Sequence, residues 1–446
     1  MAKKNFLDIV KRERGTSDYV GDQHGGASGT SGSGLPSGNE GNFMFATGIE
    51  CSYPMIHHGH LRRDQLEECG HYEHWRDDLR LVQELGLKVL RYGLPYYSIH
   101  KAPGKYDWTF ADEVMNEMQR LNITPILDLL HFGLPSWIGD FQNPELPVHF
   151  AEYADAVATR YPWVRYYTPV NEIYVTAKMS AKDGIWNEQL KSDRAFVTAM
   201  KHIVAASILA THSIANRRPD VVVVQSESAE YTHEARASKS KEVTLGNKQR
   251  LLSLDLLYAY PPDADIFMYM MDNGLTREEY DWFMAGEPPG YQIMGNDYYG
   301  RNEHIILPDG KMCQAEDVMG WYQITKEYYE RYKKPVMHTE TNTFDPEEAP
   351  TWLWKQWINI LQMRKDGVPV LGFTWYSLID QIDWDTGLAK KSDHVNACGL
   401  YDLKRKPRPV AAAYRQLLEE FGQITIVPHG EVFEVTDRPA RLKVEV

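Results

Sequence analysis

The sequence predicts an α/β protein, a (β/α)8 (TIM) barrel with long loop insertions. Three observations carry this prediction. From residue 72 onward, short apolar strand patterns alternate with amphipathic helix patterns, which is typical of a parallel sheet. Eight such units fit into a span of roughly 380 residues, the size of a barrel with long loops. Two of the later strand patterns lead into a glutamate, Glu172 and Glu340, at the edge where barrels of this type carry their active sites.

Composition and charge narrow the class of protein. The 446 residues are 43% hydrophobic and 25% charged, which is ordinary for a globular chain. The formal net charge of −14 argues against a nucleic-acid or anionic-membrane partner and favours a neutral small substrate. The four cysteines show no CxxC spacing, and neither a signal peptide nor an apolar run of membrane-spanning length is evident. We therefore expect a soluble cytoplasmic protein, whose oligomeric state the sequence leaves open.

Three segments are expected along the chain. Residues 1–42 contain a Gly/Ser-rich run at 25–34 and are predicted to be flexible, with a short helix near 5–14. Residues 43–421 hold the barrel, and 422–446 form an extension with a weak hairpin pattern that packs on its outside. The insertion at 226–290 exceeds what a minimal barrel needs, and its role is left open.

The first predicted strand begins near residue 43 and runs to Ile49, and Glu50 follows directly at its end. The helix at 72–85 has Trp75, Leu79 and Val82 at helical spacing and stops at Gly86, a C-cap glycine. The remaining predicted strands are 87–92, 123–130, 164–170, 221–225, 291–299, 335–340 and 368–375. The remaining predicted helices are 110–121, 148–160, 194–217, 317–332, 351–365 and 409–421.

A loop with His57, His58 and His60 follows the first strand. Three histidines suggest a metal site, but no carboxylate stands at ligand spacing. We interpret them as ordinary loop residues, and we expect neither metal nor cofactor.

Glu172 and Glu340 are the candidate catalytic residues. Each ends a strand pattern, and they are 340 − 172 = 168 residues apart. Two carboxylates that end two strands of one parallel barrel can face each other across a pocket, as glycoside hydrolysis requires. A solvated glutamate at a strand end is the alternative for either residue alone.

Several motifs in one order resemble glycoside hydrolase family 1, the retaining β-glycosidases, over nearly all of residues 43–421. TPVNEIY resembles the acid/base motif TxNEP, with Ile173 in place of proline, and HTETN resembles the nucleophile motif TENG. Further similarities are LHFGLP to HWDLP, DYY at 297–299 to NYY, WYSLIDQIDW to WSLLDNFEW, Arg91 to the second-strand arginine, and the KPRP run before the last helix.

The resemblance implies a role for each matching residue. Glu340 would attack the anomeric carbon, and Glu172 would protonate the leaving oxygen and then deprotonate water, with its pKa raised by Glu340. Arg91 and the Tyr298 hydroxyl would stabilise the Glu340 carboxylate. The remaining implied contacts are to substrate: Asn171 to the 2-hydroxyl, His131 to the 3-hydroxyl and Trp384 under the sugar ring. A barrel-interior ion pair for Arg91, and packing at the rim for His131 and Trp384, are the structural alternatives.

Three departures from the family pattern fall on sugar recognition. Glu50 and its neighbours stand where the family has a glutamine clamp, and Tyr376 replaces a tryptophan beneath the sugar. Asp383 replaces a glutamate and is expected to withdraw its carboxylate by about 1.5 Å. The catalytic glutamates and Asn171 are retained, so we expect retained chemistry with altered glycone specificity. A transglycosidase acting on decorated glycosides and a catalytically silent sugar-binding barrel are the alternatives.

Overall fold

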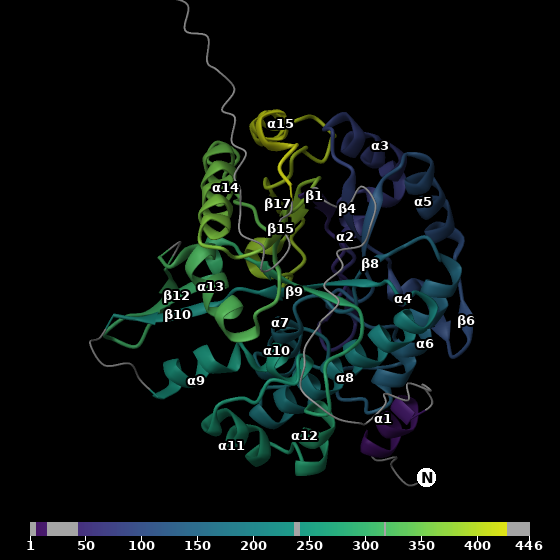
Figure 1. Ribbon diagram of the computed structural model, residues 1–446, viewed down its shortest axis with the longest axis vertical. Coiled ribbons are helices and arrows are strands. Elements are labelled where there is room, and N and C mark those ends of the chain that lie inside the picture. Colours follow the sequence, from purple (N-terminus) through teal and green to yellow (C-terminus); the bar gives the residue numbers. More distant parts are fainter. Residues whose placement is uncertain (1–5, 16–42, 236–240, 316–317, 426–446) are drawn as a thin grey trace, which may run out of the picture.

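The computed structural model describes residues 6–15, 43–235, 241–315 and 318–425, and its centre is a closed barrel of eight parallel strands. Neighbouring strands pair in the order in which they occur along the chain, and the last pairs with the first (Figure 1). The strands are β1 (Met44–Ile49), β4 (Val89–Gly93), β7 (Thr124–Asp128), β8 (Tyr166–Thr168), β9 (Val222–Ser228), β11 (Tyr291–Asp297), β14 (Val336–Glu340) and β15 (Val370–Trp375). The predicted (β/α)8 barrel is therefore confirmed.

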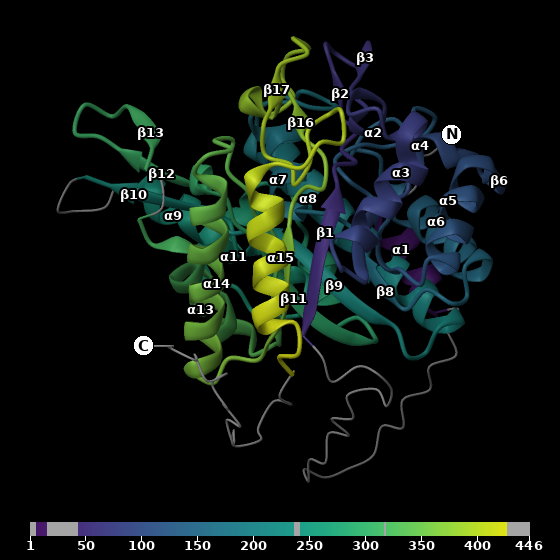
Figure 2. The ribbon, with the colours of Figure 1, turned by 90° about the horizontal axis from the view of Figure 1, so that it is seen from above.

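Helices form the outer layer, and those predicted from apolar periodicity are present within three residues of their predicted ends. They are α3 (His71–Glu84), α5 (Thr109–Arg120), α6 (Leu146–Arg160), α8 (Asp193–Arg217), α13 (Gly320–Tyr332), α14 (Ala349–Lys365) and α15 (Pro409–Phe421). Gly86 follows α3 with φ = 83°, a conformation that glycine adopts without steric cost. Figure 2 shows α13, α14 and α15 side by side along the barrel wall.

Apolar side chains form two separate layers. Inside the barrel, one layer contains Ala46, Ile126, Val222, Val224, Ile293, Met337 and Leu371, all buried. The larger layer lies between the strands and the surrounding helices. Because successive side chains of a strand point to opposite faces, each strand contributes to both layers.

Extra elements gather around the loops that follow the strands. The described residues of the 226–290 insertion, all but 236–240, form β10 (Tyr231–Glu234) and the helices α9 (Lys241–Gln249), α10 (Leu252–Leu257), α11 (Ala264–Asp272) and α12 (Arg277–Phe283). β10 forms a small sheet with β12 (Glu303–Ile306) and β13 (Met312–Gln314). In Figure 2 the arrow of β1 points to the end that carries β2 (Met55–Ile56), β3 (Leu61–Arg62), β16 (Gln381–Ile382) and β17 (Val395–Asn396).

The N-terminal segment contains a docked helix. Residues Phe6–Gly15 form α1, which contacts α6 and α8. Phe6, Leu7 and Val10 are buried, and the Phe6 ring lies 5.1 Å from that of His202. The short helix predicted near residues 5–14 is therefore confirmed, and because its apolar face packs on the barrel, this part of 1–42 is not a flexible linker. Residues 16–42, and most of the predicted C-terminal hairpin, lie outside the described residues.

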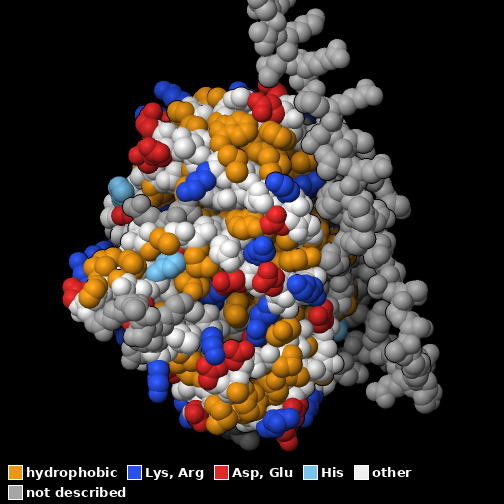
Figure 3. Space-filling view, turned by 60° about the vertical axis from the view of Figure 1, so that its left-hand side comes forward, with side chains coloured by type: hydrophobic (Ala, Val, Ile, Leu, Met, Phe, Trp, Pro, Cys, Tyr) orange, Lys and Arg blue, Asp and Glu red, His pale blue; other side chains and the backbone are white. Residues whose placement is uncertain are grey.

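Helix α8 is long and apolar enough to cross a membrane by length and composition alone. However, 83% of its most apolar window is buried inside the protein, as expected for a core helix. On the face drawn in Figure 3, acidic, basic and hydrophobic side chains are interspersed.

Candidate active site

Glu340 ends β14, and its carboxylate is held by two donors. The Arg91 guanidinium, from β4, donates through Nη1 to Oε1. The Tyr299 hydroxyl donates to Oε2 over 2.6 Å. Glu340 is only 4% exposed, so these contacts replace the water that would otherwise solvate the charge. An ionised, oriented carboxylate at the C-terminal edge of a barrel is suited to attack an electrophilic carbon.

The tyrosine that contacts Glu340 is Tyr299, and the predicted contact from Tyr298 is wrong. Tyr298 is fully buried and donates its hydroxyl hydrogen to Glu303 Oε1 over 2.7 Å. The physical reason is the alternation of an extended chain: Asp297 and Tyr299 face the site, so the residue between them points away. The sequence alone indicates this orientation, because β11 ends at Asp297 and Tyr299 stands two residues further on, on the same face of the extended chain.

Glu172 lies between β8 and the short helix α7 (Ile173–Ala177) in a left-handed conformation with φ = 39°. This conformation costs a non-glycine residue about 1–2 kcal/mol, and the Glu172 N–H donates to the Ser226 carbonyl over 2.8 Å. Burial raises the pKa of the Glu172 carboxyl well above its ordinary value, and the charges of Asp297 and Glu340 raise it further. A carboxyl that keeps its proton near neutral pH can act as a general acid.

Asp297 is a third buried carboxyl at the site, and the family resemblance implies no role for it. It ends β11 beside Glu340 in the strand register, and its two oxygens lie 2.7 and 2.6 Å from the Ser226 hydroxyl. Burial and the charge of Glu340 raise its pKa well above the ordinary value. Asp297 also ranks ahead of Glu340 among the charges that raise the pKa of Glu172. The predicted effect of Glu340 on Glu172 is therefore present, but Asp297 contributes more.

Arg91, Asn171 and His131 form one hydrogen-bonded chain. Arg91 Nη2 donates to Asn171 Oδ1 over 2.6 Å, and Asn171 Nδ2 lies 3.0 Å from His131 Nε2. Since an amide nitrogen only donates, Nε2 accepts, and Nδ1 carries the hydrogen that points to Asp128 Oδ2 at 2.9 Å. The structure brings these predicted residues together beside Glu340. Their contacts to sugar hydroxyls stay predictions, because each polar group is engaged with a neighbour.

Glu50 and Tyr376 line the same side of the barrel opening. Glu50 accepts from the Ser52 N–H over 2.8 Å and from Gln381 Nε2 over 3.1 Å, and burial raises its pKa. The Tyr376 ring lies nearly parallel to His131, at 8°, and its hydroxyl donates to the Ile49 carbonyl. A side chain at position 48 would clash with this ring, because a Cβ on Gly48 would lie 2.4 Å from it. Both predicted residues therefore reach the site.

Asp383 does not reach the sugar-binding side, and that prediction is wrong. Its fully buried carboxylate accepts hydrogen bonds from Arg63 Nη2 at 3.0 Å, from the Ser392 hydroxyl, and from the backbone N–H groups of residues 392–394. Burial alone would raise its pKa, but these hydrogen bonds prevail and lower it to about 2. The shorter side chain is thus enclosed by the loop that follows β16 and has a structural role.

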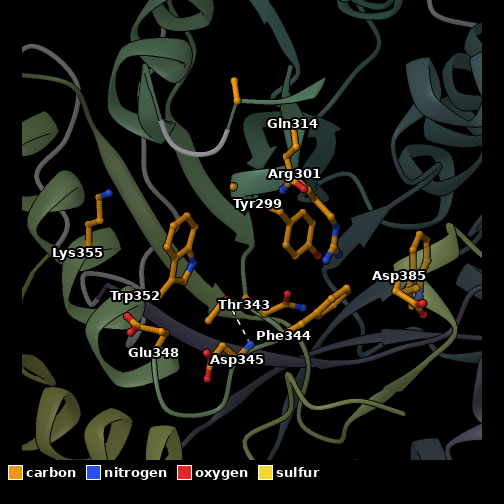
Figure 4. A pocket seen from close by; sticks show the side chains of 14 residues that line it. Tyr299, Arg301, Gln314, Thr343, Phe344, Asp345, Glu348, Trp352, Lys355 and Asp385 are labelled. Carbon is orange, nitrogen blue, oxygen red and sulfur yellow. Dashed lines mark hydrogen bonds between the residues drawn. The ribbon is translucent and has the colours of Figure 1, made fainter. Parts of the chain in front are cut away.

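Trp384 is half-buried and packs edge-on against Phe132 and Trp186, with ring centroids 6.0 and 6.2 Å apart. It also lines a cavity of about 790 Å³ that reaches the residues around Glu340. Figure 4 shows aromatic and charged side chains around this cavity. Its lining consists of Tyr299, Gly300, Arg301, Gln314, Ala315, Asn342, Thr343, Phe344, Asp345, Glu348, Trp352, Lys355, Trp384 and Asp385. Trp384 therefore packs against neighbouring rings and also borders the cavity, and its predicted contact with the sugar ring stays a prediction.

One cluster in the described part of the chain has donor atoms close enough to hold a metal ion. Ligand atoms of Cys51, Asp128 and His131 lie within 4.8 Å of one another. The cluster fits a metal poorly, because Arg91 already pairs with Asp128 at 2.8 Å and burial raises the pKa of the Cys51 thiol. The loop histidines His57 and His58 are exposed at the tip of the β2–β3 hairpin and belong to no such cluster.

A closed barrel that carries two buried glutamates at its active edge, beside an arginine and a tyrosine, defines the class of glycoside hydrolases. Comparison with known proteins supports this class. The sequence pattern of "Glycosyl hydrolase family 1" matches residues 55–259. Over this stretch the chain is similar to that family, and its low identity to the relatives marks the likeness as a distant one.

The relatives are similar to this chain at low sequence identity. A 6-phospho-beta-glucosidase of Clostridium longisporum is 24% identical over 383 residues, which is 72% of this chain and 78% of the relative. The aryl-phospho-beta-D-glucosidase BglA of Bacillus subtilis is 23% identical over 389 residues, covering 73% and 79%. A solved structure of the beta-glucosidase from Thermotoga maritima, in complex with a methoxycarbonyl-substituted glucoimidazole, superposes with a TM-score of 0.70 at 19% identity. It covers 85% of this chain and 98% of that one.

Proposed function

We propose that the protein is a retaining β-glycosidase that hydrolyses a small β-glycoside by double displacement. The proposal rests on the different surroundings of the two glutamates. The Glu340 carboxylate pairs with Arg91 and accepts from Tyr299, whereas Glu172 is buried, forms no ion pair with a described residue, and has its pKa raised by burial and by the neighbouring carboxylates. Two carboxyls whose surroundings push their protonation states apart suit the roles of nucleophile and general acid.

In the first step, a Glu340 oxygen forms a bond to the anomeric carbon while the bond from that carbon to the leaving oxygen breaks. Glu172 gives its proton to the leaving oxygen. Glu340 then becomes a neutral ester, so one of the charges that raised the pKa of Glu172 is lost. The Glu172 carboxylate next removes a proton from water, whose oxygen attacks the anomeric carbon and releases Glu340.

The glycone is proposed to differ from unmodified glucose. Asp383 is engaged by Arg63 and the loop at 392–394, so its carboxylate is not available to sugar hydroxyls. Glu50 and Gln381, buried and hydrogen-bonded to each other, lie on the side of the site that holds His131 and Tyr376. A site built to hydrogen-bond particular hydroxyls rejects sugars that leave its polar groups unpaired.

A panel of aryl β-glycosides with different glycones tests the proposal. The measurements are release of the aryl alcohol and, by NMR, the anomer of the sugar that forms first. We expect hydrolysis of at least one β-glycoside with the β-anomer formed first. A first-formed α-anomer would contradict retention, and release from none of the substrates would indicate a silent sugar-binding barrel. An excess of glycosyl transfer over hydrolysis would indicate a transglycosidase.

A further inference from the structure

Arg301 is a cation that lies against two aromatic rings. Its guanidinium carbon lies 4.4 Å from the centroid of the Tyr299 ring and 4.2 Å from that of Phe344. Among residues 6–15, 43–235, 241–315 and 318–425, no acidic side chain forms an ion pair with it. The half-buried Arg301 thereby differs from Arg91 and Arg63, each of which is paired with two carboxylates.

The position of Arg301 connects it to the reaction centre. The Tyr299 side chain that stacks on Arg301 donates its hydroxyl hydrogen to Glu340. One aromatic ring therefore separates the Arg301 cation from the proposed nucleophile. Both Tyr299 and Arg301 line the 790 Å³ cavity.

Of the residues expected to bind the sugar, Trp384 alone lines the cavity. Arg91, His131 and Asn171, the residues gathered beside Glu340 on the sugar side, are not part of its lining. Its walls are instead formed by segments that follow β11, β14 and β15. A glycoside bound with its sugar against the first set of residues would extend its leaving group into this cavity.

Three acidic residues line the cavity, Asp345, Glu348 and Asp385, and none of them forms an ion pair with Arg301. Asp345 accepts a hydrogen bond from the Glu347 N–H over 2.9 Å. Asp385 is paired with His394 at 3.0 Å and accepts from Asn396 at 3.2 Å. In Figure 4, Glu348 and Lys355 lie beside Trp352, apart from Arg301, which projects between Tyr299 and Phe344. Two rings that hold a guanidinium flat leave its N–H edge open for a bidentate contact with a carboxylate.

We infer that the cavity binds a planar, ring-containing leaving group that carries a carboxylate, and that Arg301 recognises this carboxylate. The inference rests on the proposed β-glycosidase function and names its substrate class: β-glycosides of hydroxyaryl carboxylic acids. Phe344 and Trp352 supply apolar surface for the ring, while Arg301 supplies the charge. The cation is partly withdrawn from water, which strengthens its contact with an anion.

The test compares two substrates of nearly identical size, the β-glycosides of 4-hydroxybenzoate and of 4-hydroxybenzamide, on the glycone that the aryl panel selects. The measured quantity is the ratio of kcat/KM for the anionic substrate to that for the neutral one. Arg301→Gln should lower this ratio by about tenfold, the usual effect of a lost charge-assisted hydrogen bond. Arg301→Lys should retain part of the preference. The intrinsic difference between the leaving groups cancels, because every variant meets the same pair.

Arg277→Gln is the matched control, since it removes one positive charge from an exposed position on α12, outside the cavity. We expect this control to leave the ratio as in the wild-type enzyme. A ratio that Arg301→Gln does not change, or that both variants change equally, would overturn the inference and leave the β-glycosidase function standing. Failure of the wild-type enzyme to hydrolyse any aryl β-glycoside would overturn both.

Discussion

The hydroxyl of Tyr299 donates to Oε2 of Glu340 over 2.6 Å. This contact stabilises the carboxylate before the reaction, and its loss leaves a buried charge with one donor fewer. Tyr299→Phe should lower kcat/KM by about tenfold to a hundredfold, since hydrogen bonds to charged groups contribute about 1.5–3 kcal/mol.

Tyr298→Phe provides the control for this prediction, because its hydroxyl contacts Glu303 and not Glu340. We expect this variant to lower the melting temperature and to leave kcat/KM close to the wild-type value. If Tyr298→Phe impaired turnover as much as Tyr299→Phe, the assignment of Tyr299 to the nucleophile would be wrong.

Asp297 is expected to set the alkaline limit of activity. The general acid must be protonated, so kcat/KM falls as pH rises through the raised pKa of Glu172. Asp297→Asn removes the charge that raises the pKa of Glu172 most, and it should move this alkaline limb of the pH profile to lower pH by roughly one unit. Glu227→Gln should move it in the same direction by less, because Glu227 follows Asp297 and Glu340 among the charges that raise this pKa. An unchanged limb in both variants would contradict the electrostatic coupling.

Asp383 is expected to stabilise the fold. Because its pKa is lowered to about 2 in the folded protein, its contribution is present above the unfolded pKa near 4 and is lost as pH falls through the folded value. Asp383→Asn leaves Arg63 with one carboxylate fewer and should destabilise the protein by about 3 kcal/mol at pH 7. The difference in unfolding free energy from wild type, measured by denaturant titration, should shrink between pH 4 and pH 2. A constant difference over this range would contradict the structural role.

Glu50, and not Asp383, is expected to influence the glycone preference. Glu50→Gln keeps the size of the side chain but removes its ability to bear a charge beside Gln381. We expect the order of kcat/KM values across a panel of aryl glycosides to change. Asp383→Glu is the comparison, and it should lower stability without changing that order. The opposite pattern would restore Asp383 as the residue that recognises the sugar.

The barrel and most of its site were predictable because strand periodicity and the residues at strand ends are local signals. All eight strands and the approach of Arg91, Asn171 and His131 to Glu340 follow from that pattern. Other features depend on tertiary contacts. The direction of Asp383 is decided by Arg63 and by a loop beginning at Leu388, which supply its hydrogen-bond donors. The role of Asp297 emerges only when β11 is placed beside β14.

Rescue by azide distinguishes Glu340 as the nucleophile from Glu172 as the acid/base residue. Glu340→Gly removes the attacking carboxylate and should abolish hydrolysis of an aryl β-glycoside. With azide added, the account predicts an α-glycosyl azide, because the anion enters from the face that Glu340 occupied. Glu172→Ala with azide should instead give a β-glycosyl azide through the intact covalent intermediate. A β-azide from Glu340→Gly, or an α-azide from Glu172→Ala, would contradict the assignment.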